Sequence, residues 1–222
     1  MNGFPFAIVG FDLDGTLVDT AGDLTAAVNH ALGLAARAPL TEAAVRPMIG
    51  LGARHMLEQG FAATGGIPGG DFERLYHELL RFYEANIAVH SRAFPGLIAA
   101  LDLLDAHGVR IAVVTNKRED MARKLLGELG LADRMATIIG GDTLGPGSAK
   151  PSPAPIHRMI ERSGGGRAAF VGDSIYDVMA ANSAGVTSIA VSFGFLDRPA
   201  HELGADHVIE HFDELGPLLA RL

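Results

Sequence analysis

Short apolar segments alternate with longer helical patterns along most of the chain, and this alternation constrains the fold more than any other feature. The apolar segments cover residues 7–12, 110–115, 137–141, 169–172, 188–191 and 207–209. They are apolar at most consecutive positions, which is typical of strands buried on both faces of a sheet. The sequence therefore predicts an α/β fold in which helices cover both faces of a parallel sheet.

Helices are expected between these strands, and several have recognisable ends. Segments 97–107 and 120–129 each stop before a glycine, which readily adopts the left-handed conformation that follows a helix. Further helices are expected after Pro153 and from about Ser174.

The segment from residue 22 to residue 89 breaks this alternation. It has no convincing strand but carries helical patterns over residues 23–37, 41–48, 53–63 and 71–88. We therefore predict an all-helical cap domain, residues 18–90, inserted into a core domain formed by residues 1–17 and 91–222. A cap joined to the core by two neighbouring chain crossings is able to open and close as a lid.

Composition excludes several classes of protein. The 222 residues include no cysteine, which rules out a disulfide framework, a thiolate nucleophile and a Cys-ligated zinc site. The net charge of -8 argues against a surface for nucleic acid or for an anionic membrane. Neither a signal-peptide pattern nor an apolar run of roughly 18 residues is found, so we expect a cytoplasmic protein, monomeric or homodimeric.

Polar residues follow four of the predicted strands, where apolar packing does not require them. In chain order they are Asp12, Asp14, Thr115, Asn116, Lys117, Lys150, Asp173 and Asp177. Because ligands of open α/β sheets bind beyond the carboxyl ends of the strands, we expect these residues to converge on one site.

The charges of this group require compensation. Asp12 and Asp14 are two residues apart, so on an extended strand their carboxylates would point to the same side and repel. Two unit charges 4 Å apart interact by about 4 kcal/mol at an effective dielectric constant of 20. Lys150 alone cannot balance four carboxylates. A Mg²⁺ ion with oxygen ligands would balance them and would attract an anionic substrate such as a phosphoryl group.

The use of lysine supports this interpretation. The chain has three lysines, Lys117, Lys124 and Lys150, and relies on arginine for its other basic side chains. Two of the three lysines nonetheless lie in loops after predicted strands. Taken singly, each motif is compatible with a solvated loop, a helix cap or a surface lysine. Their occurrence at four strand ends favours a functional site.

The segments that carry these residues resemble four motifs of the haloacid dehalogenase-like hydrolase superfamily. The segments are DLDGT at 12–16, Thr115, Lys150 and GDSIYD at 172–177, and the resemblance extends over essentially the whole chain. It implies a Rossmann-like core, a helical cap and a Mg²⁺-dependent phosphatase that acts on a small phosphate ester. Within the superfamily, the residues in and around these motifs are similar to those of phosphatases specific for 2-phosphoglycolate.

The resemblance implies a role for each motif residue. Asp12 would be the nucleophile that forms an aspartyl-phosphate, and Asp14 would donate and accept the proton. Thr115 and Lys150 would hold the phosphoryl oxygens, with Asn116 beside the substrate.

The same resemblance implies the ligands of the metal. Mg²⁺ would be bound by Asp12, by Asp173 and by the main-chain carbonyl of Asp14. Asp177 would support the metal site or Lys150 without binding the ion.

Substrate choice is expected to depend on the cap. The stretch from Arg46 to Arg54 is similar to the substrate-facing loop of the family, and we hypothesise that Arg46 binds a small carboxylate such as that of glycolate. A pyrophosphatase or a sugar-phosphate phosphatase is an alternative within the superfamily. A catalytically silent protein that binds through its cap is an alternative of another class, although Asp12, Asp14 and Lys150 are all present.

Overall fold

Strand β1 (Ile8–Phe11) lies inside a six-stranded parallel sheet with the order β5-β4-β1-β6-β7-β8. The computed structural model describes residues 4–67, 69–196 and 198–222, so residues 1–3, 68 and 197 of the predicted domains lie outside the described residues. The other strands of this sheet are β4 (Arg110–Val114), β5 (Met135–Ile139), β6 (Ala168–Gly172), β7 (Thr187–Val191) and β8 (His207–Ile209). The predicted Rossmann-like α/β fold with a parallel sheet is confirmed.

Alternate residues of β1 are buried on opposite faces of the sheet, as the pleat of a strand requires. Val9 and Phe11 belong to the apolar cluster on the side of α5 (Leu97–Ala106), α6 (Glu119–Glu128) and α9 (Leu215–Leu219). Ile8 packs on the other side with residues of α7 (Ala154–Arg162) and α8 (Ile175–Ala184). Both faces are therefore covered, which explains why the strands are apolar at consecutive positions.

The direction of the chain across the sheet reverses at β1. From β1 the chain continues to β4 and β5 on one side, and then returns to β6 on the other side. Phe11 is in register with Val113 of β4 and with Val171 of β6, so these three strands end at one edge. Such a switch point is where open α/β sheets bind their ligands.

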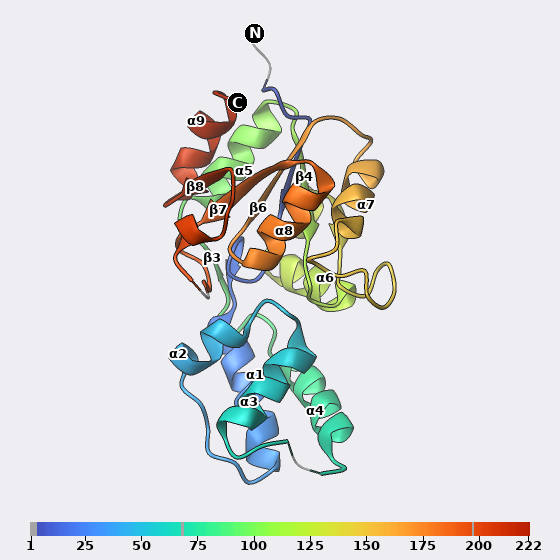
Figure 1. The fold of residues 1–222 in the computed structure, drawn as a ribbon, viewed down its shortest axis with the longest axis vertical. Helices are drawn as coiled ribbons and strands as arrows, with labels where there is room; N and C mark the ends of the chain where they lie inside the picture. The colour runs from blue at the N-terminus through green and yellow to red at the C-terminus, as the bar shows by residue number, and fades with distance from the viewer. Residues whose placement is uncertain (1–3, 68, 197) are drawn as a thin grey trace.

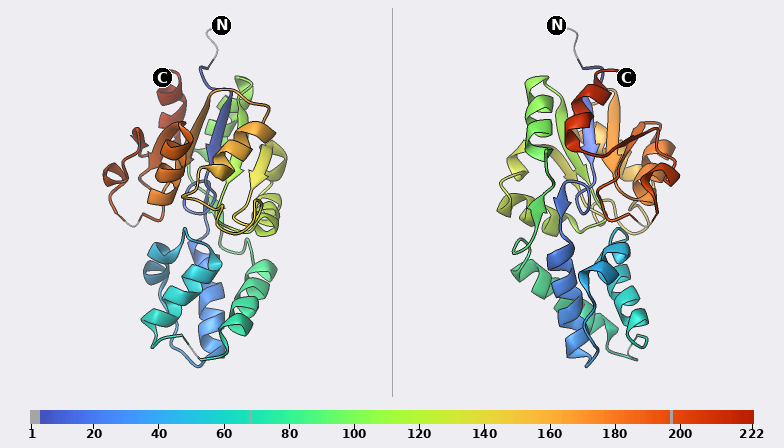
Figure 2. Two further views of the ribbon diagram at one scale, coloured as in Figure 1. Left: turned by 45° about the vertical axis from the view of Figure 1, so that its right-hand side comes forward. Right: turned by 90° about the vertical axis from the view of Figure 1, so that its left-hand side faces the viewer.

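A helical lobe, which we define as residues 20–91, lies beyond this edge of the sheet (Figure 1). It contains α1 (Ala21–Leu34), α2 (Glu42–Val45), the 3₁₀ turn η1 (Arg46–Met48), α3 (Ala53–Ala63) and α4 (Phe72–Ala85). The two further views show the same separation, with the C-terminus on the far side of the sheet from the lobe (Figure 2). The structure contains a helical insertion at this place. The exact bounds of the cap domain stay a prediction.

The lobe is connected to the sheet through a short antiparallel ribbon. Its strands, β2 (Val18–Asp19) and β3 (Arg92–Ala93), have two residues each. The carboxylate of Asp23 joins the two crossings, because it accepts hydrogen bonds from the main-chain N–H groups of His90 and Ser91 and from the hydroxyl of Ser91. Asp23 is buried, so these bonds are protected from water.

Two local differences from the sequence prediction have simple causes. The predicted helix 41–48 is α2 followed by the 3₁₀ turn η1, because Pro47 has no N–H group to continue the α-helical pattern. The ribbon β2–β3 was not predicted, since strands of two residues leave no pattern in a sequence. Among the described residues no helix is both long and apolar enough to span a membrane.

The Asp23→Ala substitution is expected to destabilise the junction between lobe and sheet. It removes the acceptor of three hydrogen bonds and leaves buried donors without a partner, which costs about 1–3 kcal/mol per unsatisfied group. The measurement is thermal unfolding of this variant beside Asp133→Ala, which changes an exposed aspartate. Equal melting temperatures for the two variants would contradict the role given to Asp23.

Candidate active site

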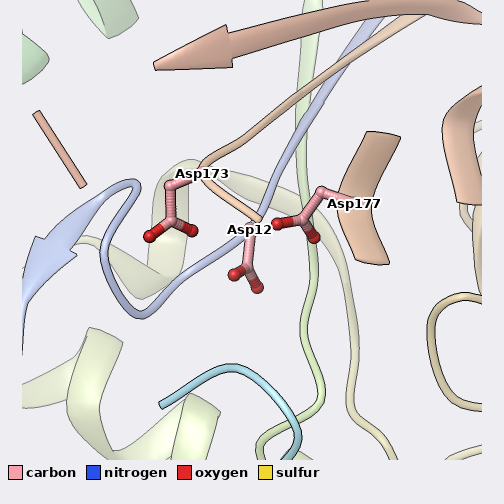
Figure 3. Close-up of side chains that lie close together, drawn as sticks. All are labelled: Asp12, Asp173 and Asp177. Carbon is pink, nitrogen blue, oxygen red and sulfur yellow. The ribbon is translucent and has the colours of Figure 1, made fainter. Parts of the chain in front are cut away.

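Three buried aspartates meet at the switch point of the sheet. Asp12 follows β1, Asp173 follows β6, and Asp177 lies in the first turn of α8. Each offers a carboxylate oxygen, and these oxygens all lie within 4.8 Å of one another. Figure 3 shows Asp12 between the other two side chains. None of the three is more than 5% exposed, so water does little to screen their charges.

The loop after β1 is shaped to approach Asp173 closely. Gly15 has φ +83, and a Cβ atom there would lie 2.1 Å from Oδ2 of Asp173. The neighbouring hydroxyl of Thr16 donates to Oδ1 of Asp173 at 3.2 Å, and the main-chain N–H of Phe195 donates to Oδ2 at 2.6 Å. Glycine at position 15 is therefore required both by the turn and by the contact.

Asp177 is held by the start of helix α8. Its Oδ2 accepts hydrogen bonds from the main-chain N–H and the hydroxyl of Ser174, and the Ser174 hydroxyl in turn accepts from the N–H of Asp177. This reciprocal arrangement is a capping box. Oδ1 of Asp177 accepts from Lys150, so both of its oxygens have protein partners.

Lys150 is the cation of this cluster. Its Nζ atom donates to the carbonyl of Val114 at 2.8 Å and to Asp177 at 2.6 Å, and lies 2.7 Å from Oδ1 of Asp12. The contact with Asp12 is an ion pair outside hydrogen-bond angles, which leaves this oxygen without a hydrogen-bond donor among the residues the structure describes. Burial alone would lower the pKa of Lys150, but Asp12 and Asp177 raise it above its usual range.

One lysine is too little charge for three aspartates. Burial, together with the charge of Asp177, raises the pKa of Asp12 from 3.8 to about 7 despite the opposing effect of Lys150. Burial and the charge of Asp12 raise the pKa of Asp173 well above its usual range. A divalent cation would remove this excess charge. The all-oxygen donor set and the undersatisfied oxygen of Asp12 fit a hard cation of this kind.

Asp14 lies in a different environment from Asp12. Strand β1 ends at Phe11, so Asp14 belongs to the turn that follows and does not share one side of a strand with Asp12, as the sequence had suggested. Its Oδ2 lies 2.9 Å from Nζ of Lys117, and its Oδ1 accepts a hydrogen bond of 2.7 Å from the hydroxyl of Thr20. The two acids are therefore each paired with a lysine of their own.

The loop after β4 contributes two of the predicted residues. The Oγ1 atom of Thr115 accepts a hydrogen bond from the main-chain N–H of Lys117, which leaves the hydroxyl hydrogen available as a donor. The side-chain amide of Asn116 donates to the carbonyl of Gly50 in the lobe and to that of Lys150 in the core. Asn116 therefore bridges the two parts of the molecule.

A cavity of about 380 Å³ opens between the sheet edge and the lobe. The core provides its polar residues, which include Asp12, Asp14, Thr115, Asn116, Lys117 and Lys150. The lobe provides mainly apolar residues, which include Leu24, Ile49, Leu51, Met56, Leu79 and Leu80. Most of the polar side chains thus lie on the core side of the cavity, and the lobe adds those of Arg54, Tyr76 and Tyr83.

The structure places Arg46 outside this cavity. Its guanidinium pairs with Asp19 at 2.8 Å and with Glu42 at 3.1 Å, and it lies 4.9 Å from the centre of the Phe195 ring. The following residues 49–54 do line the cavity. The structure thus brings together every predicted core residue but leaves Arg46 at the outer junction, because two carboxylates attract it there.

Lys117 was among the polar residues that follow predicted strands, but no role in the site was predicted for it. It lies next to Asp14, and only 7% of its side chain is exposed. The sequence shows that lysines are few and that this one follows a predicted strand. It does not show that Lys117 pairs with Asp14.

Known proteins are similar to this chain over most of its length. A family model described as haloacid dehalogenase-like hydrolase matches residues 9–191. A phosphoglycolate phosphatase of Agrobacterium fabrum is 44% identical over 97% of this chain and 92% of its own length. One from Caulobacter vibrioides is 40% identical over 93% of this chain and 87% of its own length.

A solved structure shows the same fold. The crystal structure from Haemophilus somnus of a protein described as a predicted phosphoglycolate phosphatase superposes with a TM-score of 0.90. It is 28% identical to this chain, and the match covers 96% of this chain and 98% of that one.

Binding of a divalent cation is expected to stabilise the protein more as the pH rises. The raised pKa of Asp12 means that its contribution to the stability of the metal-free protein is full below 3.8 and is lost as the pH rises through about 7. The cation binds only the ionised carboxylates and offsets that loss. The increase in melting temperature on adding Mg²⁺ should therefore be larger at about pH 8 than at about pH 6.

The variant Asp173→Asn is the control for this measurement, because it keeps the size of the side chain and removes one charge. It is expected to lose the Mg²⁺-dependent increase in melting temperature. An increase that is independent of pH, or that persists in this variant, would contradict the proposed cation site.

Proposed function

The chain belongs to the haloacid dehalogenase-like hydrolase family, and we propose that it is a Mg²⁺-dependent phosphatase that hydrolyses 2-phosphoglycolate through Asp12. The observation that carries the proposal is the separation of its two acids. Asp12 lies beside Lys150 in the buried cluster, whereas Asp14 lies beside Lys117 at the cavity. One carboxylate is thus placed to attack and the other to handle a proton.

The reaction follows from these positions in two steps. In the first, an oxygen of Asp12 attacks phosphorus, the bond between phosphorus and the ester oxygen breaks, and Asp14 protonates the departing alkoxide. In the second, Asp14 takes a proton from water, the water oxygen attacks the aspartyl-phosphate, and inorganic phosphate leaves with Asp12 restored.

Two residues support the phosphoryl group in both steps. The free hydroxyl hydrogen of Thr115 would donate to a phosphoryl oxygen. Lys150 donates to Val114 and to Asp177, and its ammonium group also forms an ion pair with Asp12. The contact with Asp12 is the one a phosphoryl oxygen would replace, because Asp12 loses its charge once it carries the phosphoryl group.

Mg²⁺ would be held by Asp12, by Asp173 and by the main-chain carbonyl of Asp14. When bound, it supplies positive charge that stabilises the phosphoryl oxygens during transfer. Asp177 is proposed to support Lys150 and not the ion, because both of its oxygens already accept hydrogen bonds from Ser174 and Lys150. This division leaves open positions on the ion for the substrate and for water.

Support for 2-phosphoglycolate comes from the relatives and from the cavity. The two bacterial relatives at 40–44% identity are phosphoglycolate phosphatases. The cavity of about 380 Å³ accepts a small ester, and most of its lobe side is apolar, so it offers few polar groups for the hydroxyls of a sugar.

Turnover of 2-phosphoglycolate should depend on Asp12. The Asp12→Asn substitution keeps the shape of the side chain and removes the attacking charge, so we expect a loss of kcat of at least about 10³-fold. The measurement is release of inorganic phosphate with and without Mg²⁺, for 2-phosphoglycolate, pyrophosphate and a set of sugar phosphates.

The matched control is Asp133→Asn, an exposed aspartate that should leave the rates unchanged. Wild-type protein that releases no phosphate from any substrate in the presence of Mg²⁺ would overturn the proposed function. A higher kcat/KM for pyrophosphate or a sugar phosphate would overturn the proposed substrate alone.

A further inference from the structure

Lys117 occupies a position that the steps above do not use. It follows Thr115 and Asn116 in the loop after β4, and its Nζ atom lies 2.9 Å from Oδ2 of Asp14. It also lies 4.6 Å from the centre of the ring of Tyr83, on helix α4 of the lobe. This lysine is therefore a buried cation at the surface where core and lobe meet around the cavity.

The arginines near the cavity are already neutralised by carboxylates. Arg54 makes two hydrogen bonds with Glu73, at 2.7 and 2.8 Å. Arg118 pairs in the same way with Asp120. Lys150 makes two hydrogen bonds with the protein and an ion pair with Asp12. Lys117 differs from them, because its ammonium group has three N–H donors and Asp14 occupies one side of it.

A second observation at the same place indicates a ligand. The hydroxyl of Tyr83 is buried at the cavity, and within the described part of the chain it makes no hydrogen bond of normal length and angle. Lys117 lies close enough to interact with this hydroxyl, although the contact lacks the geometry of a hydrogen bond. Unsatisfied buried hydroxyls are rare and costly in proteins unless a ligand or water satisfies them.

The chemistry of the reaction connects these two residues with the substrate. The ester oxygen that leaves must lie beside Asp14, which protonates it, and Lys117 is in contact with Asp14. In 2-phosphoglycolate a single carbon separates this oxygen from the carboxylate. A carboxylate so close to Asp14 has Lys117 within reach, whereas Arg46 is held outside the cavity by Asp19.

We propose that Lys117, assisted by the hydroxyl of Tyr83, binds the carboxylate of the substrate and thereby selects phosphate esters of small 2-hydroxy acids. This inference rests on the proposed phosphatase activity and gives Lys117 the role that the sequence suggested for Arg46. It also explains the apolar character of the lobe side. Because apolar walls do not compensate a charge, the substrate carboxylate is favoured beside Lys117 and Tyr83.

The test compares two substrates that differ only at this group, 2-phosphoglycolate and 2-hydroxyethyl phosphate. We measure kcat/KM for both and use their ratio as the selectivity. In Lys117→Met the ratio should fall about 30-fold, the size expected for loss of a charge-assisted hydrogen bond. Any effect through Asp14 changes both rates and cancels from the ratio. Lys117→Arg should restore part of the selectivity.

Two further variants keep the test decisive. Lys124→Met changes an exposed lysine that binds the main chain of Glu84, and it should leave both rates unchanged. Tyr83→Phe keeps the ring beside Lys117 and removes the hydroxyl, so it should lower the ratio several-fold even if Lys117→Met does not fold.

The outcomes separate the two proposals. A ratio that is unchanged in the folded Lys117→Met and Tyr83→Phe variants, while wild-type protein hydrolyses both esters, would overturn this inference and leave the phosphatase intact. Wild-type protein that hydrolyses both esters equally would also overturn it. Wild-type protein that hydrolyses neither would overturn the proposed function itself.

Discussion

The burial of like charges at one edge of the sheet is the constraint on which the remaining structure depends. Asp12, Asp173 and Asp177 bring their oxygens within 4.8 Å of one another where water is largely excluded. Lys150 reduces the repulsion, and its own position depends on the carbonyl at the end of β4. The cluster therefore exists only when β1, β4 and β6 lie side by side, so the fold and the chemistry have the same origin.

The turn after β1 converts this cluster into two distinct functions. Gly15 lets the chain turn back beside Asp173, and Asp14 is thereby carried away from Asp12 toward Lys117. The hydroxyl of Thr20, where the lobe begins, binds the same Asp14. The acid proposed to transfer the proton is thus tied to the junction with the lobe, whereas the acid proposed to attack is fixed in the core. A change in the position of the lobe would act on the first and not on the second.

Sequence reasoning predicted which residues of the core converge, because the ends of parallel strands obey a simple rule. Parallel strands end at one edge, so polar residues after β1, β4 and β6 had to meet there. The positions of Asp12, Thr115 and Asp173 follow from that rule, whereas Lys150 lies in the longer loop after β5.

The features that sequence reasoning missed depend on contacts between distant segments. Arg46 lies in the predicted loop but pairs with Asp19, and no local pattern reveals that partner. Lys117 stood out as a rare lysine, yet its significance comes from Asp14 and Tyr83, which lie on other elements. Short ribbons such as β2–β3 leave no periodic signal at all. Contacts between the lobe and the core therefore could not be predicted from local sequence patterns.

The central claim is that Asp12 becomes covalently phosphorylated during turnover. The most direct measurement is an acid quench during a single turnover of 2-phosphoglycolate with Mg²⁺, followed by peptide mass spectrometry of the protein. We expect a transient phosphoryl group on the peptide that contains Asp12, and its loss on treatment with hydroxylamine. Consumption of the substrate without phosphorylation at Asp12, or with phosphorylation at another residue, would contradict it.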